Sequence, residues 1–288
     1  MEEPTTGRIE RVGPLVRRLL APNPSPFTYT GTQTYIVGEE DVAVIDPGPD
    51  LAEHVDALAE ALRGERVSAI VCTHTHRDHS PAARPLKAAT GSPIVGCAAL
   101  SLHDEGPRSD EAFDADYRPD RVLGDGETVA GSGWTLEAVA TPGHTSNHIC
   151  LALRENSALF SGDHVMGWST TVVAPPDGDM AAYMASLDRL LGRDDRIYYP
   201  AHGPAVEDPQ AHLRRLIEHR RGRERQILER LARGEGRIEA MVADMYADVD
   251  PRLHPAAARS VLAHLIDLKR RGEVEEAGEE AGFWTLAR

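Results

Sequence analysis

Short apolar runs that end in small or polar residues recur along the first two thirds of the chain and predict a strand-rich fold. Residues 34–38 and 42–46 are two such runs, and only residues 39–41 separate them, so we expect a β-hairpin. Further strands are predicted at residues 68–72, 134–140 and up to Ile197, and helical patterns lie between them at residues 51–62 and 180–191. The pattern therefore predicts a mixed α/β fold.

After Pro204 the pattern changes to helices followed by a small hairpin. The helical stripes comprise Leu213, Leu216, Ile217, Ile227, Leu228 and Leu231, and then residues 261–268. The second stripe ends at Lys269-Arg270-Arg271-Gly272, a typical helix C-terminus, and strand-like segments follow at residues 273–276 and 282–286. This order resembles a winged helix. We therefore predict a catalytic domain at residues 1–208 and a winged-helix-like domain at residues 209–288.

The segment Thr73-His74-Thr75-His76-Arg77-Asp78-His79 directly follows the predicted strand 68–72 and concentrates possible metal ligands. Imidazole nitrogens and carboxylate oxygens suit zinc, iron or manganese. His74 and His76 would face the same side of an extended segment, whereas Asp78 and His79 follow a predicted turn into a helix, so one loop could serve two metal ions. A histidine-rich surface loop that binds nothing is the alternative.

The same arrangement of strand, small residue or Pro/Gly, and ligand-type side chain occurs three more times. His144 lies in Thr141-Pro142-Gly143-His144-Thr145, and Asp163 follows Ser161-Gly162. His202 lies in Tyr199-Pro200-Ala201-His202-Gly203. These repeats favour a binding site over the surface-loop alternative.

Taken together and in this order, the motifs resemble those of the metallo-β-lactamase fold hydrolases over residues 30–204. Asp46, in Val44-Ile45-Asp46-Pro47-Gly48, also fits the acidic residue that this family places after an early strand. The resemblance implies the family's αββα sandwich, in which two sheets pack face to face with helices outside. Residues 104–120, rich in carboxylates and without periodicity, are predicted to form a loop over or beside the cleft.

The resemblance also implies a dinuclear site. His74, His76 and His144 would hold the first metal ion, Asp78, His79 and His202 the second, and Asp163 would bridge the two. Asp78 and Asp163 are the two carboxylates assigned to catalysis. Asp46 would orient a ligand through a hydrogen bond, and its alternative role is to cap the Asp-Pro-Gly turn. Zinc is favoured for both divalent ions, with iron and manganese as alternatives.

The reaction implied is hydrolysis by a hydroxide that bridges the two metal ions, acting on a small ester, thioester or lactone. The alternative is a single-strand-specific endoribonuclease. Residues 31–35 and 199–204 and the C-terminal extension resemble the β-lactamase-like endoribonuclease subgroup, although Gln33 stands where that subgroup carries Asn. A metal-holding binding or regulatory protein without turnover is the third hypothesis, which the complete ligand set disfavours.

Charge favours a small-molecule substrate over RNA. The chain carries 31 Lys and Arg against 46 Asp and Glu, whereas the part from Pro204 onward is nearly balanced, with 15 against 16. Binding to a phosphate backbone normally needs a basic surface. The basic cluster Arg220, Arg221, Arg223 and Arg225 is favoured as a solvated helix face, and the predicted wing holds Glu273, Glu275, Glu276, Glu279 and Glu280. A lid or packing role is therefore expected for the C-terminal domain.

The remaining features concern the compartment. We find no signal-peptide pattern at the start of the chain and no apolar run of the roughly 20 residues needed to cross a bilayer. Cys72, Cys97 and Cys150 lie in or beside apolar runs and are predicted to be core residues rather than catalysts. We expect a cytoplasmic protein that does not associate with membranes. The sequence leaves its oligomeric state and the identity of its substrate open.

Overall fold

The computed structural model describes residues 5–100, 113–277 and 282–287. The chain forms two compact units, each of which is described by itself. The first comprises Met1–Thr141, Asn147–Ser169 and Arg193–Pro209, and the second Pro142–Ser146, Thr170–Gly192 and Gln210–Arg288. The domain boundary predicted after residue 208 stays a prediction.

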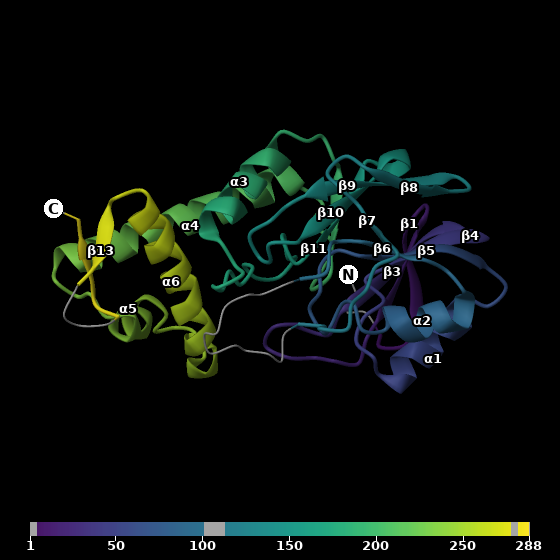
Figure 1. Ribbon diagram of the computed structural model, residues 1–288, viewed down its shortest axis with the longest axis horizontal. Helices are drawn as coiled ribbons and strands as arrows, with labels where there is room; N and C mark the ends of the chain where they lie inside the picture. The colour runs from purple at the N-terminus through teal and green to yellow at the C-terminus, as the bar shows by residue number, and fades with distance from the viewer. Residues whose placement is uncertain (1–4, 101–112, 278–281, 288) are drawn as a thin grey trace. The chain divides into compact units, whose positions relative to one another are not determined.

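The first unit contains a seven-stranded sheet with the strand order β1-β2-β3-β4-β5-β6-β7 (Figure 1). Its strands are β1 (Ile9–Gly13), β2 (Val16–Leu20), β3 (Gln33–Glu39), β4 (Asp41–Ile45), β5 (Arg66–Cys72), β6 (Ile94–Gly96) and β7 (Arg121–Val122). The predicted hairpin is confirmed, because β3 and β4 pair antiparallel around Glu40, which adopts a left-handed φ of 61°. Strands β4 to β7 pair in parallel. Parallel strands need crossovers, and the helices α1 (Ala52–Ala61) and α2 (Ala83–Thr90) lie in two of them.

A second sheet of the same unit has the order β12-β11-β10-β9-β8. Its strands are β8 (Thr128–Gly131), β9 (Trp134–Ala140), β10 (Ile149–Leu153), β11 (Ala158–Gly162) and β12 (Ile197–Pro200), with a short 3-10 helix at Arg154–Asn156. Apolar side chains from both sheets form one buried core, among them Ile36 and Ile70 from the first sheet and Leu151 and Phe160 from the second. The two sheets therefore pack against each other, as the predicted sandwich requires.

The second unit is mainly helical. It contains α3 (Met180–Leu191), α4 (Pro209–Ala232), α5 (Ile238–Met245), a 3-10 helix (Pro251–Leu253), α6 (His254–Arg270) and the hairpin β13 (Val274–Glu276) with β14 (Trp284–Leu286). Helices α4, α5 and α6 and the hairpin share an apolar core that includes Ile227, Met241, Leu265 and Trp284. This order, helices followed by a two-stranded wing, is the one that the sequence predicts.

Two predictions fall partly on residues outside the described ranges. Of the loop predicted at residues 104–120, residues 104–112 lie outside them, and residues 113–120 form no helix or strand beyond an isolated bridge between Phe113 and His76. In the wing, residues 279 and 280 also lie outside the described residues. Within the part of the chain that the structure describes, no helix combines the length and apolar character needed to cross a membrane.

Candidate metal centre

Most of the candidate ligands stand on loops that begin where a strand ends. Asp46 directly follows β4, and Thr73 and His74 follow β5, its parallel neighbour. Asp163 directly follows β11, and His202 lies two residues beyond β12, which pairs in parallel with β11. The carboxyl ends of neighbouring parallel strands share one edge of a sheet, so each sheet delivers its ligand-type side chains together.

One group of donor atoms belongs to His74, His76 and Asp163. A nitrogen or oxygen atom from each lies within 4.8 Å of the others. His74 Nε2 is 2.9 Å from His76 Nδ1, and both His74 and Asp163 are buried. Nitrogen and carboxylate donors at this spacing fit a divalent ion such as zinc, iron or manganese.

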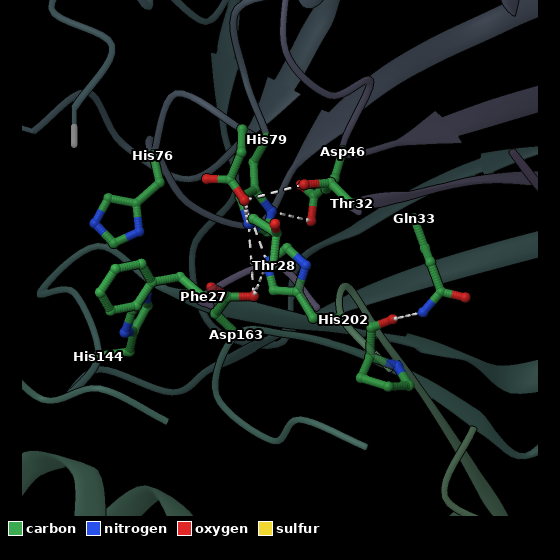
Figure 2. Close-up of polar contacts among 12 residues, drawn as sticks. Phe27, Thr28, Thr32, Gln33, Asp46, His76, His79, His144, Asp163 and His202 are labelled. Atoms are coloured by element: carbon green, nitrogen blue, oxygen red, sulfur yellow. Dashed lines mark hydrogen bonds and ion pairs between the residues drawn. The ribbon is translucent and has the colours of Figure 1, made fainter. Parts of the chain in front are cut away.

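A second group comprises Asp78, His79 and His202, whose donor atoms also lie within 4.8 Å of one another. Asp78 Oδ2 is 3.3 Å from His79 Nε2 and 3.2 Å from His202 Nε2. Asp163 Oδ1 lies 3.5 Å from the first of these nitrogens and 3.2 Å from the second, so its carboxylate adjoins both groups (Figure 2). This donor set also fits a divalent cation.

His144 belongs to the second unit, in the loop Pro142–Ser146. This loop is joined at both ends to the first unit, at Thr141 and Asn147. The imidazole is buried, and its Nδ1 lies 2.7 Å from the carbonyl oxygen of Val172, to which it donates. In the neutral ring, Nε2 then carries the lone pair that a metal ion needs. The assignment of His144 to the first metal ion stays a prediction.

Asp46 connects one ligand from each group. Its Oδ1 accepts a hydrogen bond from the Thr73 backbone nitrogen at 2.8 Å, and its Oδ2 accepts from Thr73 Oγ1 at 2.8 Å. Oδ2 also accepts from His79 Nδ1 at 3.1 Å (Figure 2). Because the hydroxyl proton of Thr73 goes to Asp46, Oγ1 can only accept from His74 Nδ1, 3.0 Å away. Asp46 thus orients His79 directly and His74 through Thr73. In both neutral rings this arrangement puts the lone pair on Nε2.

The sequence reasoning assigned no role to Thr32, which positions Asp78. Thr32 is fully buried, and its Oγ1 donates to Asp78 Oδ2 at 3.0 Å. Asn23 holds the threonine from both sides, accepting from its backbone nitrogen and donating to its hydroxyl, each at 2.9 Å. In the sequence Thr32 stands between Gly31 and Gln33, and nothing there marks it as a partner of Asp78.

Gln33 supports the loop that carries His202. Its Nε2 donates to the carbonyl oxygens of Pro200 at 3.1 Å and Gly203 at 2.6 Å, and its Oε1 accepts from Arg18 at 2.9 Å. His202 itself donates from Nδ1 to the carbonyl oxygen of Gly31 at 3.3 Å, which turns Nε2 towards the carboxylates. The glutamine side chain, which is longer than that of asparagine, thus reaches from β3 to the backbone before and after His202.

His148 positions the backbone at Asp163. Its Nε2 accepts from the Asp163 backbone nitrogen at 3.2 Å, so its Nδ1 carries the proton and donates to Thr141 Oγ1 at 2.9 Å. The turn leaves no room at Gly162, where a Cβ would lie 2.6 Å from His148 Nε2 and 2.8 Å from Thr73 Oγ1. Gly162 also has a left-handed φ of 49°. His148, four residues beyond His144, therefore acts beside the site and is not among its donor groups.

The electrostatics of the site favour a bound cation. Burial would lower the pKa of His79, but Asp78, Asp163 and Asp46 raise it well above its ordinary value. Burial likewise opposes the charged form of His202, whose pKa the same Asp163 and Asp78 raise to about 10. Burial would raise the pKa of Asp78 and of Asp163, but the two imidazoles hold both well below the usual range. Without metal, protons on these imidazoles balance the carboxylates, and a metal ion would compete for the same places.

The three cysteines are core residues, as predicted. Cys72, Cys97 and Cys150 each have at most 1% of their surface exposed. Burial raises the pKa of Cys97 to about 12 and that of Cys72 well above its ordinary value. Both thiols stay protonated at neutral pH and are poor nucleophiles.

Comparison with known proteins agrees with this geometry. The family model of the metallo-beta-lactamase superfamily matches residues 28–202, and that of the beta-lactamase associated winged helix domain matches residues 238–284. The chain belongs to the metallo-β-lactamase superfamily and is a hydrolase of that superfamily. The predicted fold class, the winged-helix-like C-terminal part and the enzyme class are thereby confirmed.

Relatives extend over almost the whole chain. It is 34% identical over 281 residues to a "Beta-lactamase-like protein 2 homolog" of Caenorhabditis elegans, covering 96% of this chain and 91% of that one. It is 30% identical over 285 residues to an "Atrochrysone carboxyl ACP thioesterase" of Aspergillus chevalieri, covering 95% and 86%. Among solved structures, a "Beta-lactamase domain protein" from Burkholderia ambifaria shares the fold with a TM-score of 0.77 at 22% identity, covering 100% of this chain and 95% of that one.

Proposed function

We propose that this protein is a dinuclear metal-dependent hydrolase of a small thioester, ester or lactone, with a thioester as the favoured substrate. The single observation that carries the proposal is the position of Asp163, whose carboxylate adjoins both groups of nitrogen and oxygen donors. Two cations a few ångströms apart require an anionic group between them, and Asp163 supplies it.

The proposal keeps the division of ligands that the sequence predicts. His74, His76 and His144 would hold the first ion, Asp78, His79 and His202 would hold the second, and Asp163 would bridge them. Zinc is the favoured metal, and the same donors accept iron or manganese. When bound, the two ions lower the pKa of a water molecule towards neutrality and polarise the scissile carbonyl oxygen.

The chain itself contributes orientation. Thr32 fixes the carboxylate of Asp78, while Asp46 fixes the rings of His79 and His74. Holding the ligands in position before substrate arrives lowers the reorganisation needed during the reaction. Asp78 and Asp163 are the two carboxylates beside the reacting centre, and therefore the catalytic residues of this proposal.

Two observations support a thioester over RNA. The similar Aspergillus chevalieri protein carries the name of an acyl carrier protein thioesterase. The acidic balance of the chain, with 31 Lys and Arg against 46 Asp and Glu, opposes binding to a phosphate backbone. For the winged-helix-like part we propose a lid or packing role.

The test combines metal analysis with a hydrolysis screen on thioesters, lactones and single-stranded RNA oligomers. We expect about two ions per chain by mass spectrometry of the purified protein, and turnover of thioesters that a chelator abolishes. His76→Ala and Asp163→Ala should each abolish turnover while the protein stays folded by circular dichroism. His254→Ala, at a half-buried histidine of the second unit, is the matched control and should keep wild-type turnover.

Unchanged turnover in both His76→Ala and Asp163→Ala would refute the assignment of the metal site. Cleavage of RNA with no thioester or lactone hydrolysis would replace the proposed substrate class by the endoribonuclease alternative.

A further inference from the structure

Three aromatic side chains of the first unit lie at the surface, although exposing them contributes nothing to the stability of the fold. They are Phe27, Tyr29 and Trp168, with 50%, 40% and 38% of their surface exposed. Tyr29 and Trp168 stack on each other, with ring centroids 5.0 Å apart and planes inclined by 20°. Because two segments far apart in the sequence make this pair, it forms a defined aromatic surface rather than two scattered side chains.

Trp168 is built onto the loop of a metal ligand. A Cβ at Gly203, the residue after His202, would lie only 2.9 Å from Trp168 Cδ1 and 3.0 Å from its backbone nitrogen. The neighbouring Gly167 donates from its backbone nitrogen to the carbonyl oxygen of His202 at 3.1 Å. Trp168 also lies five residues after Asp163, so one short segment connects the ring with the bridging carboxylate.

Tyr29 is connected to the same centre through a different segment of the chain. The Gly31 backbone nitrogen donates to the carbonyl oxygen of Thr28 at 2.9 Å, and the Gly31 carbonyl oxygen accepts from His202. One residue further on, Thr32 donates to Asp78. Both rings of the stack are therefore held by segments that also hold ligands of the second donor group.

The loop of Tyr29 is rigid, and it holds the ring outwards at a cost. Tyr29 has a left-handed φ of 57°, which costs an ordinary residue about 1–2 kcal/mol. Pro22, Pro24 and Pro26 restrict the preceding chain, and Ser25 Oγ accepts from the backbone nitrogens of Phe27 and Thr28, both at 3.1 Å. Strain of this kind persists at binding sites, and a rigid loop loses little entropy when a ligand binds. Burial of the ring does not explain the strain, because 40% of the Tyr29 surface stays exposed.

We propose that the Tyr29–Trp168 stack binds a flat aromatic acyl group of the thioester substrate and so determines its specificity. The inference rests on the proposed hydrolase function and adds the substrate class to it. A planar acyl group can extend the stack by one more ring, whereas a saturated ring of the same size has no π face to offer. The rigid connections to His202 and Asp78 keep the stack in a fixed relation to the donors that would polarise the thioester carbonyl.

The test compares two N-acetylcysteamine thioesters of equal ring size, benzoyl and cyclohexanecarbonyl, on the zinc-loaded full chain. The quantity measured is the ratio of their kcat/KM values. Tyr29→Asn removes one ring while keeping a residue that tolerates a left-handed φ, and Trp168→Ala removes the other. Each should lower the ratio about fivefold, the usual worth of an aromatic pair. Trp168→Phe keeps a π face and should keep most of the ratio. Val122→Ala is the control at another exposed apolar residue and should leave the ratio unchanged.

A second measurement does not depend on turnover. Calorimetry compares the binding of benzoate and cyclohexanecarboxylate to the zinc-loaded wild type and to Tyr29→Asn. We expect tighter binding of benzoate by the wild type and loss of that preference in the variant. If the wild type hydrolyses neither thioester, the proposed function fails and this binding preference alone decides the inference. An unchanged kcat/KM ratio in both ring variants, or equal binding of the two acids by the wild type, would overturn it.

Discussion

Replacing Asp46 by Asn tests whether one carboxylate organises both metal sites. Asparagine has nearly the same shape and tolerates the left-handed φ of 46° found at this position, so the change removes the charge and little else. One oxygen can still accept from the Thr73 backbone nitrogen. The amide NH₂ then faces Thr73 Oγ1 and His79 Nδ1, both of which donate to Asp46 Oδ2.

The expected loss can be worked out from these contacts. Two of the three hydrogen bonds to Asp46 lose their acceptor, and a hydrogen bond to a charged group contributes about 1.5–3 kcal/mol. Part of that loss is recovered when the rings turn, so we expect metal affinity to fall about 10–100-fold, the range usual for partners of metal ligands. Both ions should be affected, because His79 loses its partner directly and His74 loses it through Thr73.

Metal affinity is measured by competition with a chromophoric chelator. Thr73→Val interrupts only the path to His74, and it should weaken one of two binding steps. Asp41→Asn is the matched control, since Asp41 is also buried and accepts hydrogen bonds from Ser68, Ser132 and Arg66, at the other end of β4. It should lower the free energy of unfolding and leave metal affinity unchanged. Wild-type affinity for both ions in Asp46→Asn would refute the reasoning.

Two further predictions concern protons and space at the centre. Metal ions bind only the neutral imidazole, and the pKa of His202 is about 10 without metal, so loading at pH 8 must expel its proton and that of His79. Apparent affinity should therefore rise with pH up to about 10, and calorimetry in buffers of different ionisation enthalpy should detect about two protons released per chain; no release would contradict these pKa directions. Gly162→Ala places a Cβ 2.6 Å from His148 Nε2 and should cost about 1–3 kcal/mol of unfolding free energy together with metal content. Gly133→Ala, where φ is also left-handed but the space is open, is its control, and equal effects would show that steric crowding at the site is not the cause.

Much of the fold and most of the donor groups could be predicted because the signals are local. Each ligand loop follows an apolar run, and a strand that ends in a small residue and then a ligand-type side chain is visible in the sequence alone, as at Gly162 and Asp163. Histidines at i and i+2, such as His74 and His76, reach the same side of an extended segment. Strand ends that share one sheet edge then bring these side chains together.

The supporting side chains could not be predicted, because their roles depend on contacts between distant segments. Thr32 reaches Asp78 across 46 positions, and Gln33 reaches Gly203 across 170. A buried threonine and a glutamine carry no signal for such pairing. The unit division also departs from chain order, since Pro142–Ser146 and α3 group with the C-terminal helices. Hydrophobic periodicity predicts helices and strands, but it does not predict which of them pack together.

Asp46 shows where local and distant information meet. The sequence places an aspartate after a strand and before Pro47-Gly48, which fits a turn cap as well as a ligand-orienting role. The parallel pairing of β4 with β5 favours the orienting role, because the Asp46 backbone nitrogen donates to the carbonyl oxygen of Val71 at 2.8 Å and so sets the aspartate beside Thr73. From there its carboxylate contacts His79 directly and reaches His74 through the hydroxyl of Thr73. The register of β4 against β5 thus lets one buried carboxylate orient a residue of each donor group. Its removal should therefore weaken the binding of both metal ions rather than of one.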